Sequence, residues 1–188
     1  MVSSSRGIRA RLLWAAVRGF GIGFVLAGSV AAETRRSLSP AESLPPPTGA
    51  VILTVRGDIA RANGAAEARL DRAMIEAMGL STMHTGTIWT EGTSEFQGID
   101  LSRLMVHLGA DGSVLRLTAL NDYAVDIPMS EAVEGGPMLA MHMDGKMLSP
   151  RDRGPLWLVY PYDTNPAYKN EVSYSRSIWQ LSMIEVLP

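Results

Sequence analysis

The chain has 188 residues, of which 46% are hydrophobic and 19% charged, and it contains no cysteine. This composition supports a packed core and excludes a disordered or fibrous chain. Without cysteine the chain can form no disulfide, no thiolate-ligated zinc or iron–sulfur site and no thiol nucleophile. Its 17 basic and 19 acidic residues argue against nucleic acid as a partner, because that function needs clustered Lys and Arg.

The first residues have the pattern of a secretory signal peptide. Four arginines precede the first acidic residue, an apolar run follows over roughly residues 20–30, and Val30-Ala31-Ala32 provides small residues for cleavage. The apolar run is shorter than the about 20 residues that a membrane span requires. We therefore expect a signal peptide over residues 1–32 and a periplasmic mature chain, with an uncleaved N-terminal anchor as the alternative.

The next elements in chain order are a linker, a strand and a helix. Residues 33–49 are polar and proline-rich, which indicates a linker to a domain over residues 50–188. The apolar run 51–55 predicts a buried strand. Apolar residues at helical spacing predict a helix over about residues 65–78, with Asn63 as its N-cap.

The remainder of the chain reads as mostly strand. A second helix is predicted from the N-cap Asp100 to Gly109, because the residues between them form one apolar face and glycine suits a helix end. Residues 81–90 form a β-rich stretch, and strands are predicted over residues 114–120, 138–143, 156–160 and 178–186. Two main helices among so many strands predict an α+β fold rather than a parallel array of alternating strands and helices.

Few familiar catalytic patterns occur in the sequence. There is no G-x-S-x-G motif and no nucleotide-binding glycine pattern, and the three histidines lack the spacing of metal ligands. Trp, Tyr, Asn, Asp and Arg gather at strand ends and loops, a composition that suits a flat, hydrogen-bonding heterocycle. The sharpest candidate is the turn Asn121-Asp122-Tyr123, which follows a buried strand. Trp157 and Trp179 are equally consistent with a role in the core.

Four segments resemble the oxidoreductase molybdopterin-binding domain, the fold of sulfite oxidase. They are TGTIWTEGTSEFQGIDLSRLMVHLGA, LTALNDYAVDIP, MLAMHMDGKMLSPRDRGPLWLVYP and RSIWQLSMIEV. The resemblance covers about residues 50–187 and implies a mixed β-sheet fold. In the enzymes of this family, a cysteine on the strand before the FQGI segment ligates molybdenum, and by spacing Thr85 or Thr87 stands near that position here. Because a threonine hydroxyl does not replace a soft thiolate, we expect the pocket to lack the metal.

The chain is also similar in length, leader and motifs to a cysteine-less subgroup of short exported proteins of this fold. That resemblance implies a non-enzymatic periplasmic protein that binds a reduced pterin. Its ligand-bound form would engage the periplasmic domain of an inner-membrane GGDEF–EAL protein, which makes and degrades cyclic di-GMP. The alternatives are a molybdopterin-dependent oxidoreductase subunit with an unusual metal ligand, and a protein-interaction module with a vestigial pocket.

The resemblance also suggests roles for individual residues at the pterin. The expected contacts are Asn121 and Asp122 at the polar edge of the ring, Tyr123, Trp157 and Trp179 as stacking or wall residues, Arg153 and Arg176 at its oxygens, and His84 and Thr85 on the side where the enzymes hold molybdenum.

Overall fold

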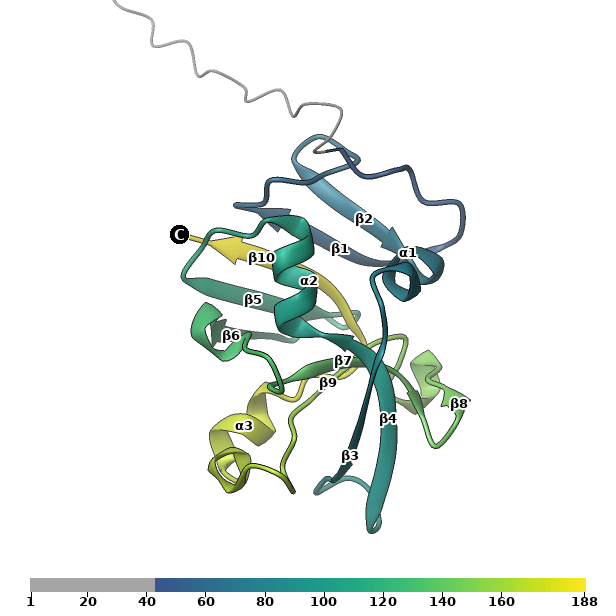
Figure 1. The fold of residues 1–188 in the computed structure, drawn as a ribbon, viewed down its shortest axis with the longest axis vertical. Coiled ribbons are helices and arrows are strands. Elements are labelled where there is room, and N and C mark those ends of the chain that lie inside the picture. The colour runs from purple at the N-terminus through teal and green to yellow at the C-terminus, as the bar shows by residue number, and fades with distance from the viewer. Residues whose placement is uncertain (1–42) are drawn as a thin grey trace, which may run out of the picture. The chain divides into compact units, whose positions relative to one another are not determined.

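The computed structural model describes residues 43–188, so the predicted signal peptide and residues 33–42 of the predicted linker lie outside the described residues. The strands of the described part are β1 (Val51–Gly57), β2 (Glu67–Asp71), β3 (Ser81–Gly86), β4 (Thr93–Asp100), β5 (Val114–Ala119), β6 (Ala124–Pro128), β7 (Met138–Met143), β8 (Lys146–Met147), β9 (Trp157–Val159) and β10 (Leu181–Leu187) (Figure 1). The helices are α1 (Arg72–Ala77), α2 (Leu101–Leu108) and α3 (Glu171–Arg176), with 3-10 turns η1 (Met129–Glu131), η2 (Pro150–Asp152) and η3 (Pro166–Tyr168).

The strands form two five-stranded sheets. The first has the order β2-β1-β10-β5-β6. Its only parallel pair is that of β1 with β10, in which Val55 lies opposite Ile184. The second has the order β3-β4-β7-β8, and β9 also pairs with β7. Mostly antiparallel sheets with helices set apart from the strands confirm the predicted α+β class.

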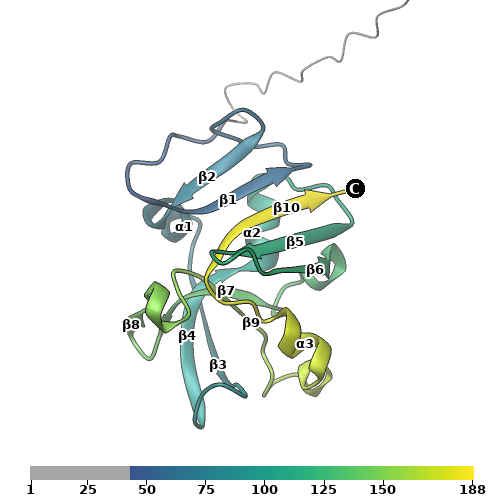
Figure 2. The same cartoon turned by 180° about the vertical axis from the view of Figure 1, so that it is seen from behind.

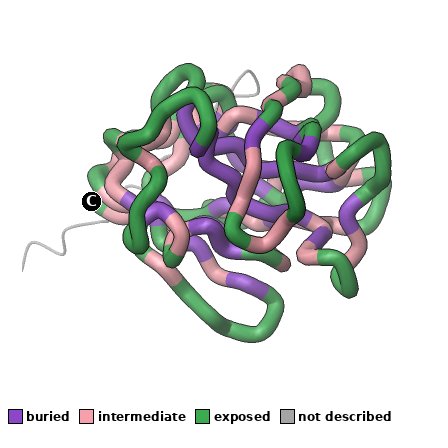
Figure 3. The backbone as a smooth tube through the Cα atoms, turned by 90° about the horizontal axis from the view of Figure 1, so that it is seen from below, coloured by how far each residue is buried: buried purple, intermediate pink, exposed green. Residues whose placement is uncertain are grey.

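Helix α2 covers one face of the first sheet. Figures 1 and 2 view the domain from opposite sides, and α2 lies in front of β10 and β5 in one view and behind them in the other. Its stripe of Leu101, Leu104 and Leu108 is fully buried, and Gly109 ends the helix with a φ of 61°, as the sequence predicted. Figure 3 shows the buried segments enclosed by exposed loops. No helix within residues 43–188 is long and apolar enough to cross a membrane.

The helix predicted over residues 65–78 is wrong in its N-terminal half. Residues 67–71 form strand β2, with Leu70 buried opposite Leu53 of β1, and only residues 72–77 are helical. Pairing with β1 buries Leu70 more effectively than a surface helix would, so tertiary contacts override the helical spacing. Asn63 does not cap a helix, because its side chain bonds the backbone N–H and carbonyl of Arg69 instead.

Two other capping details differ from expectation. Asp71 is the N-cap of α1, where its carboxylate accepts a 2.9 Å hydrogen bond from the Met74 N–H. Asp100 occupies the N-cap position of α2, but its carboxylate accepts from the Ser81 hydroxyl at 2.7 Å and makes no cap bond. That bond ties the start of β3 to the end of β4, which is the strand that leads into α2.

The sequence did not predict helix α3. It has six residues, and Ser173 is its only buried one, so it carries no apolar stripe for a pattern to reveal. Asn170 caps it by accepting a 2.9 Å hydrogen bond from the Ser173 N–H. The helix matters because it forms one wall of the site described next.

Candidate ligand-binding site

A cavity of about 350 Å³ lies between the turn that follows β5 and the segment from α3 to β10. We call it the aromatic pocket. Its lining residues are Trp89, Ala119, Asn121, Tyr123, Tyr174, Ser175, Ser177, Ile178 and Trp179. The volume lies at the lower end of the range of about 300–1,000 Å³ that small-molecule sites occupy. The pocket therefore suits a compact ring system.

Aromatic side chains dominate the walls of the pocket. Trp89 lies edge-to-face against Trp179, with ring centroids 5.7 Å apart, and against Tyr174 at 6.1 Å. Tyr123 lies in the turn between β5 and β6, and its hydroxyl donates a hydrogen bond to the Ser175 carbonyl at 3.4 Å. Because Trp179 and Tyr123 are 38% and 51% exposed, their rings remain available to stack on a ligand.

The turn Asn121-Asp122-Tyr123 sends its side chains in different directions. The side-chain oxygen Oδ1 of Asn121 accepts a hydrogen bond from the Tyr123 N–H at 3.2 Å, which leaves the side-chain NH2 group as a donor for a ligand. Asp122 has a φ of 65°, the left-handed conformation, and lines a separate groove on the outer face of the first sheet. The structure therefore brings Asn121 and Tyr123 to the aromatic pocket and places Asp122 away from it.

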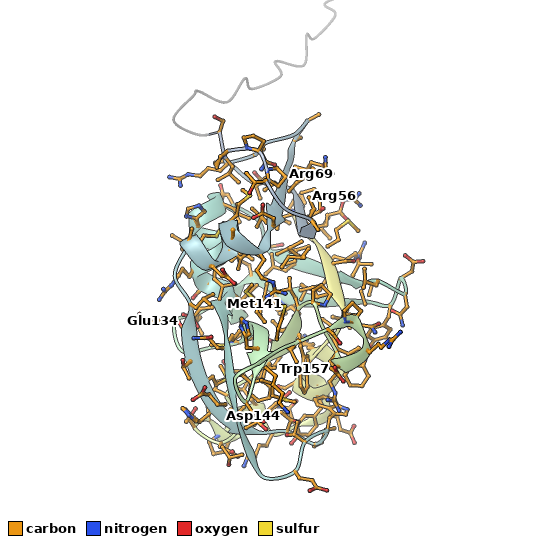
Figure 4. All side chains as sticks on the ribbon, turned by 90° about the vertical axis from the view of Figure 1, so that its right-hand side faces the viewer. Arg56, Arg69, Glu134, Met141, Asp144 and Trp157 are labelled. Atoms are coloured by element: carbon orange, nitrogen blue, oxygen red, sulfur yellow. The ribbon has the colours of Figure 1, made fainter. Side chains whose placement is uncertain are left out.

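Trp157 lies behind the pocket rather than in its lining. It is fully buried, and its ring packs edge-to-face against Trp89 at 5.9 Å and Phe96 at 5.4 Å. Its indole N–H donates to the Ser177 carbonyl at 3.2 Å. Figure 4 shows it among the side chains of the interior. Trp157 is a core residue that supports the exposed aromatic wall.

Both arginines expected at the ligand are engaged within the protein. Arg153 donates to the Trp89 carbonyl at 3.1 Å, and its guanidinium carbon lies 5.1 Å from the Trp157 ring centroid. Arg176 forms an ion pair with Glu131, whose second oxygen accepts the Tyr160 hydroxyl at 2.8 Å. Burial raises the pKa of Tyr160 far above its ordinary value, so Tyr160 remains a neutral donor.

His84 and Thr85 point to opposite sides of β3, as neighbours on a strand do. The His84 side chain is 64% exposed, and its Nε2 lies 3.2 Å from a Glu95 carboxylate oxygen. Thr85 is fully buried, and its hydroxyl accepts the Asp163 N–H at 3.1 Å. Neither residue lines the aromatic pocket.

Asp163 holds the loop after β9 against the end of β3 through hydrogen bonds to Thr85 and Gly86. Its carboxylate accepts the Gly86 N–H at 2.6 Å and pairs with Lys169 at 2.9 Å. These contacts, the Gly86 hydrogen bond foremost, lower the pKa of Asp163 below its ordinary value. The Thr87 hydroxyl is also occupied, because it accepts the Trp89 N–H at 3.1 Å.

The family model described as "Oxidoreductase molybdopterin binding domain" matches residues 67–165 of this sequence. The chain belongs to this family. Among solved structures, the molybdopterin-binding domain described here is similar to the sulfane dehydrogenase SoxCD from Paracoccus pantotrophus, with a TM-score of 0.54 and 17% sequence identity. The match covers 72% of this chain and 37% of that one, so this chain corresponds to little more than a third of it. No curated protein matches the sequence.

The residues of this domain do not fit the molybdenum that the family name implies. The sequence contains no cysteine, and residues 43–188 contain no group of three or more His, Asp and Glu that could hold a metal ion. The hydroxyls of Thr85 and Thr87 are hard oxygens already used in internal hydrogen bonds. The aromatic pocket can accept a flat ring, but nothing beside it replaces a thiolate.

Sequence reasoning missed part of the pocket. Trp89 lies in the first of the four segments that resemble the family, but it is not among the ligand contacts that the resemblance implies. Tyr174 and Ser175 lie on α3, which has no apolar stripe, and beyond the residues that the family model matches. A stretch of Tyr, Ser and Arg between two predicted strands is a composition from which they could have been suspected.

Proposed function

We propose that this domain binds a free pterin-type ring in the aromatic pocket and performs no molybdenum chemistry. The observation that carries the proposal is that every residue lining the pocket is uncharged. Molybdopterin carries a phosphate, which proteins hold with Arg, Lys or helix N-termini. Arg176 is paired with Glu131, and Arg153, which lies 5.8 Å from the ring centroid of Trp179, donates to the Trp89 carbonyl without lining the pocket. An uncharged ligand without a phosphate is therefore the better match.

The pocket's remaining groups suit the pterin ring itself. Trp89, Trp179 and Tyr123 provide aromatic surfaces for stacking, and the ring is flat. The side-chain NH2 group of Asn121 can donate to the ring carbonyl. Stacking with few directional polar contacts is how small-molecule sites combine affinity with orientation.

The location and the partner of the protein rest on its sequence. The signal-peptide pattern over residues 1–32 favours export to the periplasm. The resemblance to the cysteine-less exported subgroup favours a ligand sensor that, when loaded with a reduced pterin, binds the periplasmic domain of an inner-membrane GGDEF–EAL protein. A pull-down with that periplasmic domain, with and without the pterin, tests the partner directly.

Ligand binding can be tested by titrating the protein anaerobically with a tetrahydropterin while following tryptophan fluorescence. Trp89 and Trp179 line the pocket, so a bound ring should quench their emission. We expect Asn121→Ala and Trp179→Ala to weaken binding about tenfold or more. Asp122→Asn is the matched control, because Asp122 lies outside the pocket and Asn tolerates its left-handed backbone. Equal affinities for Asn121→Ala and Asp122→Asn would refute the assignment of the pocket.

Protein purified from a periplasmic extract separates this function from the two alternatives. We expect its native mass spectrum to show a pterin and its elemental analysis to show no molybdenum. Stoichiometric molybdenum would establish the oxidoreductase alternative. A protein that captures its membrane partner while neither carrying nor binding any pterin would establish the interaction module.

A further inference from the structure

A second cavity, of about 790 Å³, lies on the outer face of the first sheet, opposite α2. We call it the Arg72 groove. Strands β1, β10 and β5 form its floor, and the segment from Met147 to Pro150 forms a wall. Figure 2 presents this face of the sheet to the viewer, with β10 and β5 in front of α2. The groove shares only Ala119 with the lining of the aromatic pocket, so it is a separate site.

The groove combines an apolar lining with a very small number of charges. Its apolar residues include Ile52, Met183, Pro150 and the two exposed side chains Leu120 and Met147. Arg72 and Asp122 are the only charged residues among those that line it. Large apolar side chains at a concave surface indicate a site for an apolar body.

Arg72 has an unusual environment for an arginine. Its Nη1 atom is buried and has no hydrogen-bond partner among the described residues. In the described part of the chain, five other arginines form ion pairs with carboxylates: Arg56, Arg69, Arg103, Arg116 and Arg176. Arg72 forms none.

Neither Asp71 nor Asp122 neutralises the charge of the Arg72 guanidinium. Asp71, its neighbour in sequence, accepts hydrogen bonds from the backbone N–H groups of Thr48, Gly49 and Met74. Asp122 lines the same groove but makes no ion pair with Arg72. A buried guanidinium nitrogen without an acceptor is costly, and such exceptions often mark a site that an external group completes.

We propose that the Arg72 groove binds a small organic carboxylate with an apolar body. A carboxylate matches the fork of the Arg72 guanidinium, which lines the groove and has no ion-pair partner among the described residues. The apolar body would lie against Ile52, Met147 and Met183. The volume lies within the range of small-molecule sites, which favours a small ligand over a protein segment.

The test uses 4-phenylbutyrate and octanoate as probes, each compared with its neutral amide by calorimetric titration of the protein. We expect both carboxylates to bind about tenfold more tightly than their amides, because only the carboxylates pair with Arg72. In Arg72→Gln this preference should disappear, and in Arg72→Lys it should be partly retained. In Asp122→Asn the affinity should rise, because a like charge has been removed from the groove.

Arg69→Gln is the matched control. It removes the same charge from the neighbouring strand β2, but Arg69 is 54% exposed and does not line the groove. Its affinity for both probes should equal that of the unmodified protein. If neither carboxylate binds more tightly than its amide, or if Arg72→Gln and Arg69→Gln lose affinity equally, the site does not exist as proposed. A pterin bound in the aromatic pocket should leave these affinities unchanged, since the two cavities are distinct.

Discussion

The ion pair between Glu131 and Arg176 should stabilise the domain more than any exposed pair does. Glu131 belongs to the turn after β6, and Arg176 ends α3, next to pocket residues Ser175 and Ser177. One Glu131 oxygen contacts Arg176, and the other accepts the Tyr160 hydroxyl at 2.8 Å. Glu131→Gln removes the charge while keeping the shape of the side chain, so it isolates the electrostatic contribution.

The expected magnitude follows from how far the pair is buried. Each side chain is 24% exposed. Breaking a fully buried pair costs about 3–5 kcal/mol, whereas exposed pairs contribute about 0–1 kcal/mol. A pair that is three-quarters buried lies between these limits, so Glu131→Gln should lower the free energy of unfolding by about 2 kcal/mol. For a domain of this size, that corresponds to a fall in Tm of roughly 4–8 °C.

Urea unfolding, followed by tryptophan fluorescence, measures this effect in a double-mutant cycle. We expect Glu131→Gln and Arg176→Gln to be non-additive, with a coupling energy of about 1–2 kcal/mol. The comparison pair is Arg116 and Asp126, which form two hydrogen bonds of 2.9 Å but have side chains 47% and 51% exposed. Solvent screens this pair, so its coupling should be close to the error of the measurement.

The comparison separates burial from geometry. If Asp126→Asn destabilises the domain as much as Glu131→Gln does, the quality of the hydrogen bonds matters more than burial. Additive effects of Glu131→Gln and Arg176→Gln would show that the pair does not stabilise the fold as a unit.

Three further predictions concern the fold. Backbone N–H groups, that of Met74 foremost, lower the pKa of Asp71 below its ordinary value of 3.8. The contribution of Asp71 to stability is therefore complete at neutral pH and is lost as the pH falls through the lowered pKa. Urea midpoints measured across this pH range should fall less in Asp71→Asn than in the unmodified protein. Gly98→Ala would place a Cβ 2.0 Å from the Leu139 carbonyl oxygen and should cost about 2–3 kcal/mol in urea unfolding, whereas a wild-type midpoint would contradict this close approach. Tyr160→Phe removes the hydrogen bond to Glu131 and should cost about 1 kcal/mol by thermal denaturation, a loss that shrinks if Glu131→Gln is already present.

Local sequence patterns predicted those helices and strands whose buried residues recur at the period of a helix or a strand. The apolar stripe of α2 and the glycine at its end define that helix completely. Residues 67–71 were predicted as helix because Leu70 continues the helical spacing of Met74, Ile75 and Met78. The alternation of Ala68 and Leu70 also fits a strand, and only pairing with β1 selects the strand. Helix α3 was missed because it is held by a cap and by long-range contacts rather than by an apolar face.

The candidate site shows the same division between local and distant causes. Asn121, Tyr123 and Trp179 were predicted and do line one pocket. Asp122 lines the Arg72 groove instead and has a left-handed backbone, neither of which a pattern in the sequence indicates. Arg176 was expected to contact the ligand, but it pairs with Glu131, which lies 45 residues away in sequence. Such a partner can be found only once the fold is known.

The burial of Thr85 has a consequence for any attempt to place a metal ligand at this position. A cysteine introduced at residue 85 alone would be covered by the backbone that holds Asp163, so the thiol could not reach an incoming ion. To place a thiolate ligand here, the chain would also have to release the bonds that Asp163 makes to Gly86 and Lys169. Each change offers nothing without the other, so an exposed thiol at this position requires at least two coordinated changes.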